Sequence, residues 1–269
     1  MSLIRKILKI FGIYWLYEKW LHSQIKNKSL PKHVALILDG NRRWALSKGL
    51  EPWIGHKYGA NVVYELLNWC LELKIPSITL YVLSIENLKR DSKELNELMN
   101  ILEEKLKETL KDERIHKNKV NIKVIGKKEL LPNKIVELVN ELEESTKNYS
   151  NFFLNIALAY GGRTEIIDAV KRIALDVFEK KINIDKINEN IFEKYLYTSN
   201  LPKPDPDLII RTSGEERLSN LLNCLIRGCN AEMPMVISSA FPYWTKSRLW
   251  VLARILVDPS RFHRINSDA

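Results

Sequence analysis

The chain has few of the residues and patterns that mark several large protein classes. Its 269 residues include three cysteines, an odd number without the paired spacing of a zinc site: Cys70, Cys224 and Cys229. We therefore expect no disulfide framework and a protein of the reducing cytoplasm. The apolar stretch of residues 10–17 is too short to cross a bilayer, and no small-residue cleavage site follows it.

Three widespread enzyme signatures are also absent. The chain has no Gly-x-x-x-x-Gly-Lys-Ser/Thr loop and no Gly-x-Gly-x-x-Gly after a strand, which weakens nucleoside triphosphate and dinucleotide hypotheses. It has no Gly-x-Ser-x-Gly elbow, which weakens acyl transfer. No internal repeat, low-complexity tract or linker divides the sequence.

Basic residues exceed acidic ones by 42 to 33, which gives a net charge of +9. Such an excess favours an anionic partner, whether nucleic acid, a phosphorylated metabolite or a membrane surface. A nucleic-acid-binding protein needs a clustered basic face with exposed aromatic residues. The polar residues here gather at predicted strand ends instead, so we expect no nucleic-acid partner.

The N-terminal segment, residues 1–28, predicts an amphipathic helix. Residues 1–22 interleave apolar and aromatic side chains with Arg5, Lys6 and Lys9. Such a helix can lie in a membrane interface or pack on its own domain or a partner subunit, and both remain open. The first alternative predicts peripheral contact with the cytoplasmic face of the membrane through residues 1–22.

Strand-like and helix-like segments alternate through residues 29–269, which we expect to form one domain. The predicted strands are 34–38, 77–83, 120–125, 152–159 and 208–211. The predicted helices are 61–73, 92–110, 132–148 and 164–178. This alternation predicts an α/β domain with a mostly parallel central sheet and helices on both faces.

The most informative segment follows the first strand. Val34–Leu38 is an apolar run that ends in Asp39, Gly40 and Asn41, with Arg42 and Arg43 directly after them. A carboxylate beside arginines and free N–H groups of a helix N-terminus is typical of a metal-bridged phosphate site. A plain strand–turn–helix junction with two solvated arginines explains the same residues, so this segment alone does not decide.

Three further polar clusters follow predicted strands, in Ser84–Arg90, Tyr160–Glu165 and Arg211–Ser219. Each alone fits a turn better than a site. In open α/β sheets, however, ligands bind at the carboxyl ends of strands, so four clusters there predict one shared site. His56, between two glycines, is a candidate for a phosphate contact, although a lone histidine is usually structural.

Five segments together resemble the cis-prenyltransferase family of undecaprenyl and dehydrodolichyl diphosphate synthases: His33–Ala45, Gly55–Gly59, Ser84–Arg90, Asn155–Ile166 and Asp207–Asn220. The resemblance implies the family's α/β fold and condensation of isopentenyl diphosphate with an allylic diphosphate such as farnesyl or geranylgeranyl diphosphate. It further implies a cis-polyprenyl diphosphate product that serves as precursor of a glycosyl carrier lipid, Mg²⁺ as cofactor and a homodimer. The Asp-Asp-x-x-Asp box of the all-helical trans-prenyl synthases is absent.

The resemblance also implies roles for individual residues. Asp39 would coordinate Mg²⁺ and, with Asn87, take part in catalysis. The allylic diphosphate would be held by Gly40, Asn41, Arg43 and His56, and isopentenyl diphosphate by Arg211, Arg217 and Ser219. Further substrate-binding positions would be Arg42, Trp44, Ser84, Glu86 and Arg90.

The chain departs from the family pattern in two places. Pro52 stands where the family often has an arginine before the histidine, and Arg42 is a candidate replacement. The family's second metal-binding glutamate would fall at Asn230, so Glu232 is the nearest candidate and needs a two-residue shift. The irregular segment after residue 222 keeps one alternative open, a non-catalytic or impaired subunit of such a synthase. Apolar residues of 62–73 and 95–110 are candidates for the walls of a tunnel for the growing chain.

Overall fold

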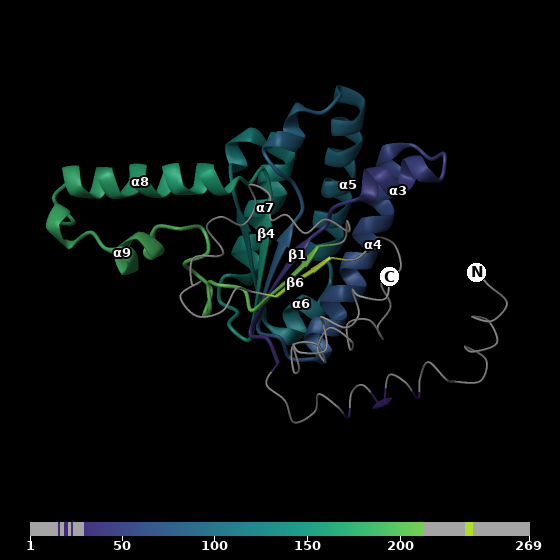
Figure 1. The fold of residues 1–269 in the computed structure, drawn as a ribbon, viewed down its shortest axis with the longest axis horizontal. Coiled ribbons are helices and arrows are strands. Elements are labelled where there is room, and N and C mark those ends of the chain that lie inside the picture. The colour runs from purple at the N-terminus through teal and green to yellow at the C-terminus, as the bar shows by residue number, and fades with distance from the viewer. Residues whose placement is uncertain (1–15, 17–18, 21–22, 24–29, 212–234, 239–269) are drawn as a thin grey trace, which may run out of the picture.

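The computed structural model describes residues 16, 19–20, 23, 30–211 and 235–238, and it centres on one parallel sheet (Figure 1). Six strands lie in the order β3-β4-β2-β1-β5-β6. Their bounds are β1 His33–Ile37, β2 Ser77–Tyr81, β3 Val120–Ile125, β4 Phe152–Ala157, β5 Leu208–Arg211 and β6 Met235–Ser238. Every pairing between them is parallel. The predicted fold class is therefore confirmed, and β6 is a strand that the sequence pattern did not predict.

The central strands are buried on both faces. All five residues of β1 and all four of β5 are buried, and Leu36 of β1 pairs with Leu80 and Ile210 on its two sides. Strands covered on both faces appear in sequence as continuous apolar runs, which is why these strands were predicted within one residue. β1 is an inner strand with β2 and β5 on its two sides. The residues that follow it therefore lie near the middle of the edge where the strands end.

The helices are α3 Asn41–Ser47, α4 Pro52–Glu72, α5 Ser92–Leu110, α6 Glu113–Asn118, α7 Asn133–Thr146, α8 Gly162–Phe178 and α9 Glu189–Lys194, with short 3-10 turns at Glu86–Lys89 (η1), Lys128–Leu130 and Ile184–Lys186. Helix α4 begins at Pro52 rather than at residue 61. Proline fits the first turn of a helix because its missing N–H has no partner there in any case. Gly55 and Gly59 then remain helical because both pack directly against α3.

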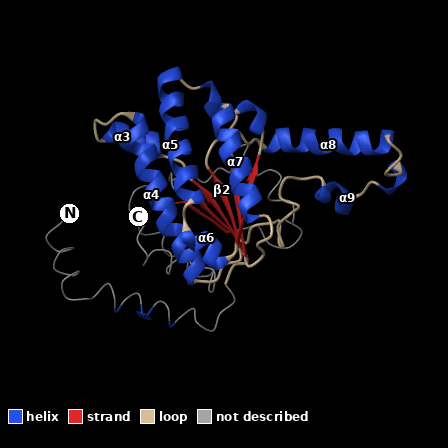
Figure 2. Ribbon diagram, turned by 180° about the vertical axis from the view of Figure 1, so that it is seen from behind, coloured by secondary structure: helices blue, strands red, loops and turns tan. Residues whose placement is uncertain are grey.

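The main core lies between the sheet and the helices of one face. Leu66 of α4, Leu106 of α5 and Val139 of α7 pack with Val34 and Leu36 of β1 in a single buried cluster. Figure 2 shows α4, α5, α6 and α7 in front of the strands on this face. The cluster explains why the amphipathic periods of 92–110 and 132–148 predicted their helices well, since each apolar stripe faces the sheet.

The opposite face carries a smaller cluster. Ala35, Ile37 and Ile209 point to this face and pack with Tyr160 and Tyr197 in a smaller cluster. Helix α8 leads away from the sheet to one side instead of lying along it (Figure 1). Among the described residues, this face is contacted by the start of α8, where Glu165 binds Tyr160 and Tyr197.

The amphipathic helix predicted over residues 1–28 lies almost wholly outside the described residues. Across the part of the chain that the structure describes, none of the helices has the length and apolar character to span a bilayer.

Candidate active site

Polar side chains converge where β1, β2 and β5 end. Asp39 follows β1, Ser84 follows β2, and Arg211 is the last residue of β5. Because these three strands are neighbours and parallel, their carboxyl ends meet at one edge of the sheet. Three of the four clusters predicted from the sequence begin at this place.

Asp39 and Arg211 form a direct ion pair. Arg211 donates from Nη2 to Asp39 Oδ2 at 2.5 Å and from Nε to the same oxygen at 3.2 Å. The other oxygen, Oδ1, accepts from the Gly40 N–H at 2.7 Å. Partial burial of Asp39 would by itself raise its pKa, but the hydrogen bond and charge of Arg211 outweigh it and hold that pKa below its ordinary value. Asp39 is therefore ionised at neutral pH.

The turn into α3 places a buried amide beside this pair. Gly40 has a φ of 89°, a left-handed conformation that glycine adopts without strain. Asn41 is buried, and its Oδ1 has no hydrogen-bond partner among the described residues. A Cβ at Gly59 would lie 2.7 Å from the Asn41 amide atoms, so α4 needs glycine at that position to approach Asn41. Asn41 is also one of the residues that line the cavity described below.

Three basic side chains lie around the carboxylate of Glu94, near the polar residues just described. Arg90 donates to Glu94 Oε1 at 2.7 Å, and His56 Nε2 lies 3.6 Å from the same oxygen. Arg42 Nη1 lies 3.6 Å from Oε2, with the Arg42 side chain mostly exposed. Burial of His56, followed by the charge of Arg90, lowers the pKa of His56 below its ordinary value although Glu94 acts in the opposite direction. His56 is thus held neutral at pH 7.

Glu94 is the site residue that sequence reasoning missed. Its side chain is only 7% exposed, although it lies in the first turn of an amphipathic helix where acids are usually solvated. The sequence showed only that Glu94 follows Arg90 by four residues; because Arg90 precedes α5 and has extended backbone, helical spacing does not predict that the two side chains meet. What the sequence did not show was that Arg42 and His56 come to the same place from α3 and α4.

The loop after β2 is fixed by reciprocal hydrogen bonds. The Asn87 N–H donates to Ser84 Oγ at 3.0 Å, and the Ser84 N–H donates to Asn87 Oδ1 at 3.1 Å. These bonds orient η1 (Glu86–Lys89), which presents Glu86 and Arg90 at the cavity. A serine and an asparagine three residues apart can thus shape this loop without any ligand.

The cluster at Tyr160–Glu165 begins beside Ser84 at the same sheet edge, but none of its residues lines the cavity described below. The Tyr160 hydroxyl donates to the Glu165 carboxylate, and both side chains are fully buried. The other Glu165 oxygen accepts from the Tyr197 N–H at 2.7 Å. These polar groups satisfy one another in the core, because the chain turns away from the sheet edge into α8.

A cavity of about 710 Å³ extends from this polar cluster into the protein. Its polar end is lined by the following predicted site residues: Asp39, Gly40, Asn41, Arg42, Arg43, His56, Ser84, Glu86, Asn87, Arg90 and Arg211. Trp44 lies outside this lining and packs on Tyr58, with ring centroids 5.1 Å apart. Arg217, Ser219 and Glu232 lie outside the described residues.

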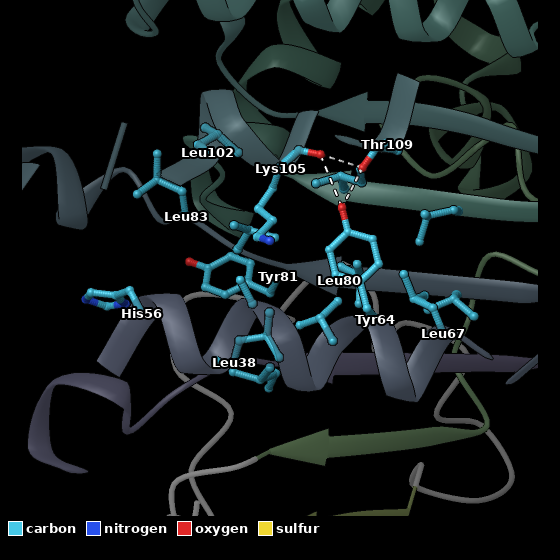
Figure 3. Close-up of a pocket in the computed structure, with 18 of the residues that line it drawn as sticks. Leu38, His56, Tyr64, Leu67, Leu80, Tyr81, Leu83, Leu102, Lys105 and Thr109 are labelled. Atoms are coloured by element: carbon cyan, nitrogen blue, oxygen red, sulfur yellow. Dashed lines mark hydrogen bonds between the residues drawn. The ribbon is translucent and has the colours of Figure 1, made fainter. Parts of the chain in front are cut away.

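The rest of the cavity is mainly apolar and lies between the sheet and two helices (Figure 3). Leu67 and Leu71 come from α4, Leu98 and Leu102 from α5, and Leu80 from β2. These are the two helices that the sequence named as candidate walls. The result is an apolar chamber with a cationic, amide-rich entrance, suited to a molecule with an anionic head and a hydrocarbon tail.

Comparison with known proteins agrees with this chemistry. The family model Prenyltransf, described as undecaprenyl diphosphate synthase, matches residues 37–261. The chain belongs to the undecaprenyl diphosphate synthase family. The resemblance to the cis-prenyltransferases, drawn from five sequence segments, is confirmed, and this cis-prenyltransferase is an enzyme that transfers prenyl groups.

Curated relatives give the same result over most of the chain. A tritrans,polycis-undecaprenyl-diphosphate synthase (geranylgeranyl-diphosphate specific) of Pyrococcus horikoshii is 49% identical over 222 residues, covering 82% of this chain and 83% of the relative. A protein with the same name from Methanopyrus kandleri is 49% identical over 210 residues, covering 78% of this chain and 77% of the relative.

Solved structures share the fold. Lavandulyl diphosphate synthase from Lavandula x intermedia, in complex with dimethylallyl diphosphate, superposes with a TM-score of 0.78 at 30% identity, covering 85% of this chain and 96% of that one. A Campylobacter jejuni protein described as a probable undecaprenyl diphosphate synthase gives a TM-score of 0.65 at 31% identity, with coverage of 84% and 95%.

Proposed function

We propose that this cis-prenyltransferase extends geranylgeranyl diphosphate with isopentenyl diphosphate units into a cis-polyprenyl diphosphate of the glycosyl carrier type. The observation that carries the proposal is the single cavity that joins a cationic entrance to an apolar interior. The choice of primer follows the relatives from Pyrococcus horikoshii and Methanopyrus kandleri, whose names give them as geranylgeranyl-diphosphate specific. Farnesyl diphosphate is the competing primer.

The entrance residues divide between the two substrates in this proposal. The allylic diphosphate is held at the start of α3, where the cavity is lined by Gly40, Asn41, Arg43 and His56. A neutral His56 donates a hydrogen bond to a phosphate oxygen without adding charge. Arg211 holds isopentenyl diphosphate together with Arg217 and Ser219 of the undescribed segment, because it ends the neighbouring strand β5.

Asp39 is the residue that would hold Mg²⁺. Its ionised carboxylate lies at the polar end of the cavity and fits this ion, which protein sites commonly hold with one or two carboxylates and the phosphates of the substrate. No group of three or more acidic, histidine or cysteine side chains is gathered in the described residues, at Asp39 or away from it, so the ion would also depend on substrate oxygens. When bound, the ion supplies charge stabilisation to the departing allylic diphosphate. Glu232 remains the proposed second ligand.

The protein side of the chemistry is electrostatic and positional. Arg43 and the N–H groups at the start of α3 stabilise charge that develops on the leaving diphosphate. Ser84 and Asn87 hold η1 in place, so Arg90 stays beside the reacting groups. The apolar chamber excludes water from the allylic carbon and thereby favours attack by isopentenyl diphosphate over hydrolysis.

A homodimer accompanies this function in the proposal, and α8 offers its surface. Ile167, Val170 and Phe178 are exposed by 53%, 52% and 84%, although they share one face of α8 by helical spacing. Isolated apolar residues are ordinary on a surface, but an apolar stripe on a projecting helix favours association with a second copy. Light scattering of Val170→Glu should show a monomer where the unaltered chain is a dimer.

Membrane contact is the remaining part of the proposal. Residues 1–22 would bring the cytoplasmic enzyme to the membrane face where its lipid product is used. Vesicle sedimentation of the full chain and of a chain that starts at residue 23 tests this, with equal sedimentation of both as the contrary result.

The decisive experiment measures the product. The full chain is incubated with radiolabelled isopentenyl diphosphate, geranylgeranyl or farnesyl diphosphate and Mg²⁺, and the extracted lipids are separated by thin-layer chromatography. We expect polyprenyl products with geranylgeranyl diphosphate as the better primer. A folded protein that extends neither primer would refute the enzymatic proposal and leave the non-catalytic subunit. Preference for farnesyl diphosphate would refute the primer assignment alone.

A further inference from the structure

One tyrosine bridges the seam, the gap between α4 and α5. Tyr64 of α4 lies eight residues after His56, about 12 Å further along the helix at 1.5 Å per residue. Its hydroxyl donates to the Lys105 carbonyl oxygen of α5 at 3.3 Å and lies 3.2 Å from Thr109 Oγ1 (Figure 3). Thr109 in turn donates to the same carbonyl at 2.7 Å. The Tyr64 ring is thereby fixed across the gap between the two helices.

A second, smaller cavity adjoins the main one at this seam. It has a volume of about 380 Å³ and shares with the main cavity the following lining residues: Tyr64, Lys105, Asp112 and Arg114. Its remaining lining comes from Asn61 and Glu108. Tyr64 thus stands between an apolar chamber and a polar recess at the protein surface.

The surroundings of Tyr64 are charged on the outer side. Lys105 Nζ lies 5.3 Å from the Tyr64 ring centroid and 2.7 Å from Glu108 Oε2. Arg114 pairs with Asp112 at 2.5 Å and donates to Asn68 Oδ1 at 2.7 Å. A hydrocarbon chain that passed this point would separate hydrogen-bonded and charged groups while exposing its own apolar surface to water.

The volume of the main cavity limits the length of chain that it can hold while the seam is bridged. A cavity of about 710 Å³ lies within the usual range for a ligand of drug size, whereas each condensation adds another five-carbon unit to the chain. The growing tail therefore fills this chamber after a limited number of condensations, and the recess across the seam is a neighbouring space that could extend it. The hydrogen bonds of Tyr64 hold the ring between the two cavities and oppose that extension.

We propose that Tyr64, held across the α4–α5 seam by Lys105 and Thr109, limits the length of the polyprenyl product. The inference rests on the proposed chain-elongating function and adds the residue that ends elongation. Opening the seam joins the two cavities, so the tail continues into the polar recess and growth proceeds further before the product is released.

The test compares product lengths of the full chain and its variants with isopentenyl diphosphate, geranylgeranyl diphosphate and Mg²⁺, by mass spectrometry. Tyr64→Ala should shift the main product upward by at least one five-carbon unit. Thr109→Val keeps the shape of residue 109 but removes its hydroxyl, and Tyr64→Phe keeps the ring but removes the bonds; both should shift the distribution in the same direction by a smaller amount. Glu65→Ala, on the exposed side of the same helix turn, is the matched control and should leave the distribution unchanged.

The failures are distinguishable. If the unaltered chain makes no polyprenyl product, the proposed function fails, whatever the role of Tyr64. If it makes products and the variants give the same or shorter lengths, the length limit lies elsewhere and the inference is overturned. Should Tyr64→Ala not fold, Tyr64→Phe and Thr109→Val decide by the same criterion.

Discussion

Arg211 donates from Nη2 to Asp39 Oδ2 at 2.5 Å, although the two residues are 172 positions apart in the chain. They meet because the strands β5 and β1 are neighbours and end side by side. Arg211 is almost fully buried and Asp39 is not. The guanidinium is thus fixed by the sheet, and the carboxylate is oriented by it. Because the proposal assigns one residue to each substrate, the pair also sets the spacing of the two diphosphates.

Asp39→Asn removes the charge and keeps the shape. We expect kcat to fall by at least about 100-fold, because the site loses the proposed metal ligand while the hydrogen-bonding outline remains. Initial rates of isopentenyl incorporation over a range of Mg²⁺ concentrations measure the effect, and excess chelator should reduce the unaltered enzyme to a similar level. Asp91→Asn, at the N-cap of α5 where the two residues cap equally well, is the control and should keep full activity. Full activity in Asp39→Asn would exclude the assigned role.

Arg211→Gln should change the titration of Asp39 as well as substrate binding. In the unaltered protein, burial raises the pKa of Asp39, and the hydrogen bond and charge of Arg211 lower it by more. Without Arg211 two of the effects that lower this pKa are lost and those of Gly40 and Arg43 remain, so the pKa of Asp39 rises and its charge is lost at a higher pH than before. We expect a higher KM for isopentenyl diphosphate and an acidic limb of the kcat/KM profile displaced to higher pH. A raised KM with an acidic limb at its original pH would mean that Arg211 binds substrate but does not control the ionisation of Asp39.

Glu94→Gln tests the cationic cluster at the entrance. The substitution leaves Arg90 without its ionised partner and removes the group nearest to both His56 and Arg42. We expect kcat/KM to fall about 10- to 100-fold and stability to fall by about 1–3 kcal/mol, the range for an unpaired, partly buried charge. Steady-state kinetics and urea denaturation measure the two effects.

Two further variants make the Glu94 result specific. Glu94→Asp retains the charge at a shorter reach and should recover part of the activity. Glu104→Gln, on the exposed face of α5, should behave as the unaltered protein. Equal kinetics for Glu94→Gln and Glu104→Gln would show that Glu94 does not position the entrance residues.

The sequence predicted those parts of the molecule that depend on short-range patterns. β3, β5 and α5 have the predicted bounds. In each of them the apolar positions of the sequence are mostly buried or partly buried between the sheet and its helices. It did not predict the start of α4, since two glycines and a proline weaken any helical pattern unless their packing on α3 is known. It also assigned Tyr160 to the site, because a turn that satisfies its own polar groups and a turn that binds a ligand use the same residue types.

The Glu94 cluster shows the same limit at the site itself. Arg42, His56 and Arg90 were each named as substrate-binding residues, but the acid between them was not. Its position depends on the crossing of α4 and α5, which no local pattern contains. Long-range geometry decided where the charges meet, whereas residue type decided only that charges were present.

His33 should make folding stability depend on pH. The side chain is fully buried, with Nε2 2.9 Å from Thr79 Oγ1, and burial lowers the pKa of His33 to about 4 despite nearby Asp207. In the unfolded chain its pKa is about 6.5. As pH falls below 6.5 the unfolded chain binds a proton that the folded protein does not bind until about pH 4, so stability is full above pH 6.5 and declines between 6.5 and 4. The difference of about 2.5 pKa units corresponds to about 3 kcal/mol.

Urea denaturation at pH 7.5, 6 and 5 measures this decline in the unaltered chain and in His33→Gln. The variant loses the Thr79 contact and starts from a lower stability at pH 7.5, but residue 33 then no longer titrates. Acids such as Asp39 and Asp207 have lowered pKa values in the folded protein, so their protonation also reduces the free energy of unfolding as pH falls. This effect is the same in both proteins. The gap between the two proteins should therefore narrow from pH 7.5 to pH 5. A gap that stays constant over this range would mean that His33 titrates alike in the folded and unfolded chain.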